Sequence, residues 1–197
     1  MVNLLKRFGS KQIRNGATIG GNLCSASPIG DLIPALLVLE ATAVLTRANG
    51  SRILDLEEFI EGYRKTALAK DEYLSKISLS IPESWSSFAF RKLSKRYEDD
   101  ISSVSIAVFL LHDNVRINEI RIALGGAGDR ALRLFEVEKI ILGRRLIDID
   151  WRAVSDALDR TIFPISDVRA SADYRKRMAI ASIKEMVDQF FLSSSGS

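Results

Sequence analysis

The sequence predicts an α+β fold in two parts, and three observations support this. The 197 residues are 47% hydrophobic and 27% charged, which is typical of a globular protein with a packed core. Apolar segments with strand-like alternation cluster at 86–126, and helical periodicity follows from residue 132 to residue 191. Strands followed by helices favour an antiparallel sheet with helices packed on one of its faces.

The first part of the chain alternates helix and strand. A helix is predicted from Asp31, because Asp31 can cap it and Pro34 is tolerated in its first turn. The residues after this helix predict a strand at 42–48, a turn at 49–50, a short strand and a short helix within 52–66, and a strand at 73–82.

The second part predicts three antiparallel strands and three helices. The strands lie at 86–94 and within 103–126, where residues 112–114 form the turn between the last two. We therefore expect a domain at 1–84, a second domain at 85–192 and a disordered tail at 193–197. The helices are predicted at 132–142, 151–158 and 171–191.

Composition excludes several classes of function. The net charge is +3 with 28 basic and 25 acidic residues well mixed, which predicts no nucleic-acid partner. The single cysteine, Cys24, excludes an internal disulfide and a cysteine-ligated cluster, and the single histidine, His112, offers no triad or metal site. We predict no catalytic and no metal-ligating residue. No apolar run is long enough for a bilayer and no signal peptide is present, so we expect a cytoplasmic protein with no membrane partner.

The stretch "ATIGGNLCSASPIGDLIP", residues 17–34, is unusually rich in small residues. Gly16 and Gly21 have the spacing of a P-loop, but Asn22 and Leu23 stand where lysine and serine or threonine are required. Two interpretations stay open. Gly20 and its glycine neighbour could turn their N–H groups toward a ligand, or they could form a tight turn that caps the following helix.

Motifs along nearly the whole chain resemble the FAD subunit of molybdenum hydroxylases, most closely the small subunit of bacterial xanthine dehydrogenase. The most specific are "IRNGATIGGNLCSASPIGDLIPAL" and "FPISDVRASADYR"; within the latter, residues 169–175 point to the xanthine dehydrogenase branch rather than the carbon monoxide dehydrogenase branch. Between them lie "FIEGYRKTAL", "LSIP", "KLSKRYEDDIS" and "IALGGAGDRALR".

This resemblance implies a fold and a cofactor site. The fold would be the C-terminal part of a VAO/PCMH-type FAD-binding domain, followed by a domain like the C-terminal one of the CO dehydrogenase flavoprotein, with a three-stranded antiparallel sheet and helices. Asp31 would bind a polar part of the flavin nucleotide, and Leu74 would pack on the ring. Lys92 would lie near the isoalloxazine, with Arg91 as its rival, and the loop 96–101 would lie where the nicotinamide enters. The implied FAD contacts are Thr18, Ile19, Gly20, Gly21, Asn22, Ser25, Asp31, Leu74 and Lys92.

The implied function is electron transfer from iron–sulfur clusters through FAD to NAD. The molybdenum cofactor, the 2Fe-2S clusters and purine hydroxylation would belong to other domains or subunits. Relatives carry an earlier FAD subdomain with a glycine-rich diphosphate loop, which is missing here. We therefore expect a fragment, split gene product or truncated paralogue, inactive alone, that forms oligomers and assembles with the missing subdomain, the molybdenum subunit and the iron–sulfur subunit.

Two alternatives stay open at this stage. The chain could be a truncated, non-catalytic interaction module that no longer holds FAD. It could also be the flavoprotein subunit of another family member, of the carbon monoxide dehydrogenase or aromatic hydroxylase type.

Overall fold

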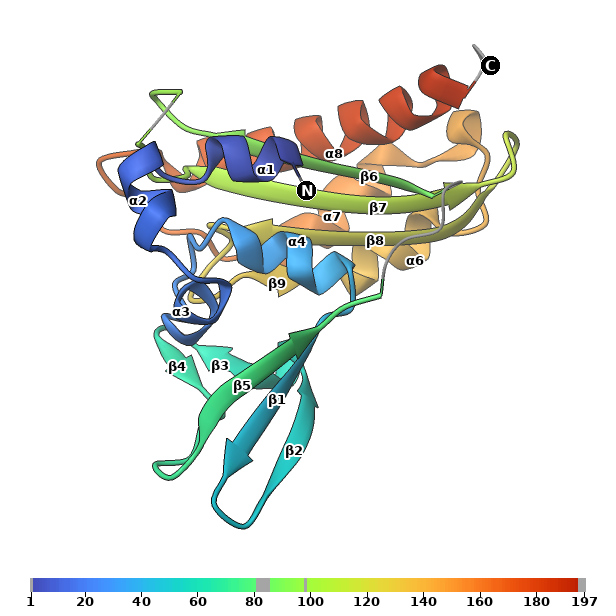
Figure 1. Ribbon diagram of the computed structural model, residues 1–197. Helices are drawn as coiled ribbons and strands as arrows, with labels where there is room; N and C mark the ends of the chain where they lie inside the picture. Colours follow the sequence, from blue (N-terminus) through green and yellow to red (C-terminus); the bar gives the residue numbers. More distant parts are fainter. Residues whose placement is uncertain (1, 81–85, 98, 195–197) are drawn as a thin grey trace.

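The computed structural model describes residues 2–80, 86–97 and 99–194. In Figure 1 a small sheet projects from a larger layered body. The first part contains α1 (Val2–Arg7), α2 (Lys11–Gly16), α3 (Ile19–Cys24), α4 (Leu32–Val38), β1 (Thr42–Arg47), β2 (Gly50–Asp55), α5 (Leu56–Phe59), β3 (Ile60–Gly62), β4 (Lys65–Thr66) and β5 (Tyr73–Ser78). The second part contains β6 (Ser87–Leu93), β7 (Val104–His112), β8 (Ile117–Gly125), β9 (Leu132–Arg133), α6 (Phe135–Ile141), the short 3₁₀ helix η1 (Leu146–Asp148), α7 (Trp151–Thr161) and α8 (Ala172–Ser194).

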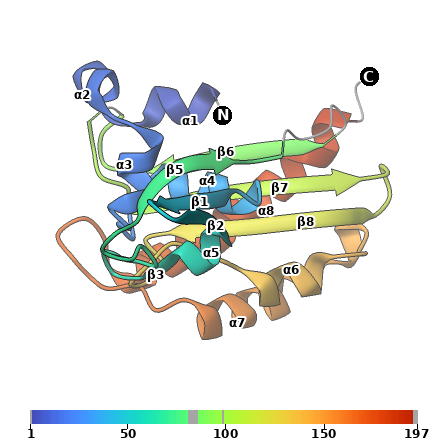
Figure 2. The ribbon, with the colours of Figure 1, turned by 60° about the horizontal axis from the view of Figure 1, so that its bottom comes forward.

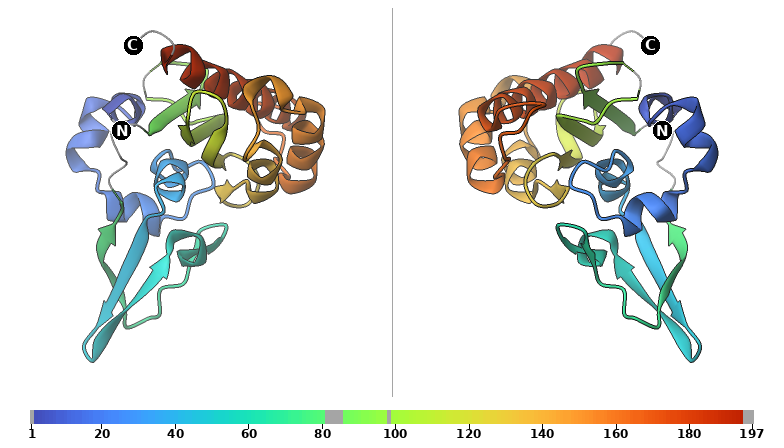
Figure 3. Two further views of the ribbon diagram at one scale, coloured as in Figure 1. Left: turned by 90° about the vertical axis from the view of Figure 1, so that its right-hand side faces the viewer. Right: turned by 90° about the vertical axis from the view of Figure 1, so that its left-hand side faces the viewer.

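The larger sheet has the order β6-β7-β8-β9 and is antiparallel throughout. Helices α6, α7 and α8 cover one of its faces, as Figure 3 shows edge-on. The predicted α+β class and antiparallel sheet are confirmed. The expectation that helices cover only one face is wrong, because α4 packs on the opposite face against β7 and β8. Figure 2 shows α4 and β1 in front of this sheet and α8 behind it.

Strand β7 explains how one sheet supports two cores. Its side chains alternate between the faces, so Ile106, Val108 and Leu110 join the core under α6–α8. Ala107 and Phe109 point the other way, into the core under α4. Because all five are nearly inaccessible to solvent, β7 reads as a continuous apolar run rather than as a half-polar strand.

The smaller sheet has the order β2-β1-β5, and β1 is its central strand. Ala43 and Leu45 of β1 are buried in the core that α4 shares, while β2 is almost entirely exposed. The turn between β1 and β2 is formed by Ala48 and Asn49, one residue earlier than predicted, because Gly50 already pairs with Arg47 as the first residue of β2. Between β2 and β5, the chain forms α5 and the short β3–β4 hairpin.

Several elements differ from the sequence-based expectation. Helices α1, α2 and α3 and the short strands β3, β4 and β9 were not predicted, and β9 extends the predicted three-stranded sheet to four strands. Helix α8 continues to Ser194, two residues into the predicted tail, and residues 195–197 lie outside the described part. The predicted domain boundary at 84/85 also lies outside the described residues.

Candidate functional site

The small-residue stretch forms helix α3 rather than an isolated glycine turn. Thr18 caps it, because its Oγ1 accepts a hydrogen bond of 2.9 Å from the N–H of Gly21. At the other end, the Ser25 hydroxyl donates to the carbonyl of Asn22 at 2.7 Å. Of the two interpretations left open, the tight turn does not form, because both glycines lie in the first turn of α3. Thr18, Ile19, Gly21 and Ser25 remain exposed.

Helix α3 lies next to Leu74, a predicted FAD contact that is distant from it in the sequence. A Cβ atom at Gly20 would lie 3.8 Å from Cδ2 of Leu74 on β5, so these two predicted FAD contacts are neighbours across 54 positions of sequence. Asn22 Oδ1 is buried and has no hydrogen-bond partner in the described residues. A buried carbonyl oxygen without a donor is costly, and a ligand N–H or O–H would satisfy it. Because Gly20 and Asn22 are two positions apart on a helix, the contact with Leu74 and the unpaired amide oxygen lie on different sides of α3.

Asp31 and Lys92 lie apart from this exposed surface and are bonded to each other. Lys92 Nζ donates to Asp31 Oδ2 at 2.6 Å and to the carbonyl of Arg7 at 3.1 Å, and Asp31 Oδ1 accepts from the hydroxyl of Ser102. The Lys92 and Asp31 side chains are 2% and 10% exposed. The predicted side-chain cap of α4 by Asp31 is wrong, because its carboxylate makes these bonds instead. The flavin contacts assigned to both residues remain predictions.

The structure separates Lys92 from its rival Arg91. Adjacent residues of a strand point to opposite faces, so Arg91 extends toward α8, where it forms a two-pronged ion pair with Glu185 at 2.5 and 2.9 Å. Of these two cations, it is Lys92 that faces the side of the sheet that carries Asp31 and α4. If one of the two serves the cofactor, the geometry favours Lys92.

A cavity of about 200 Å³ opens directly beyond the small-residue stretch. Arg64, Arg169 and Arg175 line it together with a single carboxylate, Asp167, so its lining is cationic. The remaining lining residues are Ser27, Pro28, Ile29, Tyr63, Gly126, Gly128 and Ile165.

Asp167 accepts hydrogen bonds from four donor groups at the edge of this cavity. Burial alone would raise the pKa of Asp167, but hydrogen bonds from the N–H groups of Ala170 and Arg169 and from the Arg175 side chain outweigh it, and the pKa falls to about 2. Arg175 Nη2 reaches Asp167 Oδ1 at 2.8 Å, and Arg175 itself is 3% exposed. The sequence motif 169–175 marked this region, but nothing in it revealed the partner of Arg175.

The predicted loop 96–101 lies next to the same region. Lys95, the residue before this loop, donates from Nζ to the carbonyl of Val168 at 2.9 Å and so ties the start of the loop to the segment that carries Asp167. The guanidinium of Arg7 lies 4.3 Å from the ring centre of Tyr97, and Tyr97 is largely exposed. The role of the loop in nicotinamide access stays a prediction; residue 98 lies outside the described part.

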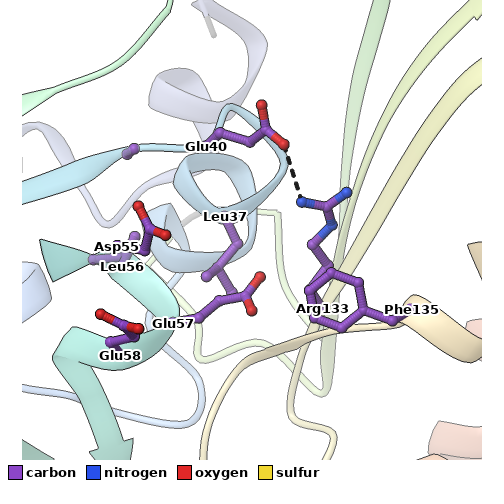
Figure 4. Close-up of a pocket in the computed structure, with 9 residues that line it drawn as sticks. Leu37, Glu40, Asp55, Leu56, Glu57, Glu58, Arg133 and Phe135 are labelled. Atoms are coloured by element: carbon purple, nitrogen blue, oxygen red, sulfur yellow. Dashed lines mark hydrogen bonds and ion pairs between the residues drawn. The ribbon is translucent and has the colours of Figure 1, made fainter.

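A second, acidic cavity was not foreseen from the sequence. It has a volume of about 400 Å³ and lies between α4, α5 and the start of α6 (Figure 4). Arg133 and Glu40 both line this cavity and form an ion pair there, with 3.3 Å between Nη1 and Oε1. Desolvation by burial raises the pKa of Glu57, which lines the cavity, although the nearby Arg133 opposes this. Its other acidic residues, Asp55 and Glu58, are spaced in sequence like ordinary surface residues, so no signal marked them.

The described residues contain no group of histidine, cysteine and acidic side chains suited to a metal ion. Among the described helices, none is long and apolar enough to cross a membrane.

Two family descriptions together match most of the chain. Residues 1–83 match "FAD binding domain in molybdopterin dehydrogenase", and residues 89–190 match "CO dehydrogenase flavoprotein C-terminal domain". The chain is 31% identical over 179 residues to the glyceraldehyde dehydrogenase medium chain of Sulfolobus acidocaldarius, which covers 90% of this chain and 63% of that protein. It is 40% identical over 132 residues to xanthine dehydrogenase of Blastobotrys adeninivorans, which covers 65% of this chain and 9% of that protein.

Solved structures resemble the fold closely. A chain of carbon monoxide dehydrogenase from Hydrogenophaga pseudoflava, solved without the Mo-pyranopterin moiety of its cofactor, superimposes with a TM-score of 0.87 at 28% identity. The match covers 93% of this chain and 63% of that chain. The chain thus spans somewhat less than two thirds of the relatives that it matches over most of its own length.

Proposed function

Because the chain belongs to the flavoprotein family of the molybdenum hydroxylases, we propose that it binds FAD as the flavin-bearing part of a multi-subunit oxidoreductase. The observation that carries this proposal is the α3–β5 surface. There Gly20 lies against Leu74, and on another side of the same helix the buried Oδ1 of Asn22 lacks a partner among the described residues. Bound FAD would supply redox chemistry that connects iron–sulfur clusters of a partner with NAD.

The chain's own residues would hold and orient the cofactor. Gly20 and Gly21 expose backbone without side-chain bulk, so a flat ring system can approach α3 closely. Asn22 Oδ1 would accept a hydrogen bond that burial makes worth more than one in water. Leu74 offers an apolar side chain for packing against a ring, and the ion pair of Asp31 with Lys92 fixes the end of the loop that follows Ser25.

NAD is the electron acceptor in this proposal, and the cationic cavity supports it. Arg64 and Arg169 can pair with phosphate oxygens of a dinucleotide, since guanidinium groups bind phosphate with two parallel hydrogen bonds. The aromatic ring of Tyr63 lines the same cavity and offers a stacking surface. Ser27 and Pro28 connect this cavity directly to the stretch that carries the predicted FAD contacts.

The molybdenum cofactor and the 2Fe-2S clusters would reside on partner subunits in a cytoplasmic, oligomeric assembly. Within the family, we propose a xanthine dehydrogenase-like enzyme acting on purines, which the motif at 169–175 supports. Relatives named as glyceraldehyde dehydrogenase and carbon monoxide dehydrogenase mark the competing substrate classes. Turnover of the assembled enzyme with xanthine, glyceraldehyde and carbon monoxide distinguishes these classes.

The decisive test is flavin content. We expect the purified assembly that contains this chain to hold FAD and to be yellow. Asn22→Asp should lower the FAD affinity of that assembly about tenfold or more, because it replaces a neutral buried amide with a buried negative charge. Asn15→Asp, on an exposed residue of α2, is the matched control and should keep full flavin content.

Two results would contradict the proposal. One is an assembly that stays colourless at saturating FAD, which would favour the non-catalytic interaction module. The other is equal flavin content in the Asn22→Asp and Asn15→Asp variants, which would remove α3 from the cofactor site.

A further inference from the structure

A chain of buried polar contacts links the 163–175 segment to the residues after α3. Asp167 Oδ1 accepts from Arg175 Nη2 at 2.8 Å, and Arg175 Nη1 donates to the backbone carbonyl of Ser103. One residue earlier, the hydroxyl of Ser102 donates to Asp31, which is paired with Lys92. All but Asp167 of these residues are less than 9% exposed.

The glycines after β8 bring the backbone into the same corner. The N–H of Gly126 donates to the carbonyl of Pro28 at 2.7 Å. Gly126 has φ +76°, and a Cβ atom there would lie 2.6 Å from the carbonyl oxygen of Ser103. A Cβ atom at Gly125 would come within 3.3 Å of Pro34 at the start of α4. The close approach of three segments at this corner therefore requires the two glycines.

We propose that Ser102 and Arg175 are positioning residues for the cofactor segment, an inference that rests on the proposed function. Arg175 fixes the backbone at Ser103 against Asp167, and the adjacent Ser102 thereby presents its hydroxyl to Asp31. Asp31 ends the loop that begins at Ser25, so the corner sets where that loop lies relative to the exposed face of α3. Neither residue needs to touch the flavin.

A pair of buried serines provides the test. Ser102 and Ser105 are both fully buried, but the Ser105 hydroxyl has no hydrogen-bond partner in the described residues. Ser102→Ala in the full chain should accelerate amide hydrogen exchange at residues 26–31 about tenfold, the effect expected from losing one hydrogen bond to a charged group. Ser105→Ala should leave exchange in that segment unchanged. Residues 151–161 of α7 serve as the internal reference and should keep their exchange rates in both variants.

A second pair of variants tests Arg175. Arg175→Lys keeps the charge but loses the fork that reaches Asp167 and Ser103 together, and it should also accelerate exchange at 26–31. Arg177→Lys alters an exposed arginine on the same helix and should have no such effect.

Equal exchange at 26–31 in Ser102→Ala and Ser105→Ala, or faster exchange throughout the chain including α7, would overturn the positioning role. Because exchange is measured without FAD, this failure is separable from failure of the proposed function. The latter would appear as unchanged flavin content in Asn22→Asp while the exchange effect of Ser102→Ala persists.

Discussion

At the residue scale, neighbouring cations of β6 have opposite environments. Arg91 forms a half-exposed ion pair with Glu185 on α8, whereas Lys92 is buried against Asp31 on the other side of the sheet. Exposed ion pairs contribute little to stability, but removal of one partner from a buried pair leaves an uncompensated charge. Because side chains alternate along β6, the lysine forms the buried ion pair and the arginine next to it forms the more exposed one.

Lys92→Met should lower the free energy of unfolding by about 3–5 kcal/mol, because Asp31 keeps a buried charge without its main partner. The double variant Lys92→Met/Asp31→Asn should recover much of that loss. Urea denaturation measures both, and Arg91→Met, which breaks the more exposed pair next to it, is the control. Equal destabilisation by Lys92→Met and Arg91→Met would contradict the assignment.

Asp167 gives stability a defined pH dependence. Its pKa is about 2 in the folded protein against 3.8 ordinarily, so the folded state binds fewer protons than the unfolded state in this range. The stabilisation is present above about pH 4 and is lost as the pH falls toward about 2. Asp167→Asn should flatten the decline in melting temperature between these values, as thermal unfolding at a series of pH values would show. An unchanged decline would assign it to other carboxylates.

The residue-level site was only partly readable from the sequence. Glycines, a threonine and an asparagine in one short stretch marked residues 18–25 as a candidate site, although the helix α3 that they form was not predicted. The pairing of Asp31 with Lys92 joins residues 61 positions apart, and no local pattern reports such a contact. A cap was the better local interpretation of an aspartate before a helix, and a tertiary ion pair replaced it.

At the element scale, α3 is a helix that contains two glycines in its first turn. Glycine costs a helix roughly 0.5–1 kcal/mol relative to alanine, so a tight turn was one of the two interpretations that the sequence left open here. The Thr18 cap and the packing of α3 on α4 and β5 compensate for this cost. Helices α1 and α2 escaped prediction for a related reason, since each has only six residues and little apolar periodicity.

Gly20→Ala separates folding from binding. The new Cβ atom would lie 3.8 Å from Leu74, an ordinary contact, so the chain without cofactor should become more stable by about 0.5–1 kcal/mol. FAD affinity of the assembled protein should fall, because the methyl group occupies the surface assigned to the ring. Isothermal titration and thermal unfolding measure the two effects. Gly16→Ala, at the open end of α2, is the control and should leave FAD affinity unchanged.

Loss of stability without loss of FAD affinity in Gly20→Ala would show that this glycine serves the backbone of α3 rather than a ligand.

At the scale of the whole molecule, the first and second parts share one hydrophobic core. Helix α4, from the first part, packs on the β7–β8 face where Ala107 and Ala123 leave room for it. Strand order and helix order were predictable from periodicity, because alternation and helical spacing are local. The burial of β7 on both faces was visible only as a long apolar run, which local patterns alone cannot assign to one layer or two.

Ala107→Leu should destabilise the protein by about 1–3 kcal/mol, because extra volume at a fully buried site forces α4 away from the sheet. Calorimetry should still show a single transition, since both parts melt together. Two separate transitions in the parent chain would contradict the shared core.

Because α4 packs on alanines of β7 and β8, which belong to the second part of the chain, homologous proteins cannot freely exchange their first and second parts. In a chimera that joins the first part of this chain to the second part of a homologue, α4 would pack against a sheet face whose side chains differ from those it packs on here. Recombination between relatives should therefore give a folded protein only where α4 and the β7–β8 face come from the same parent.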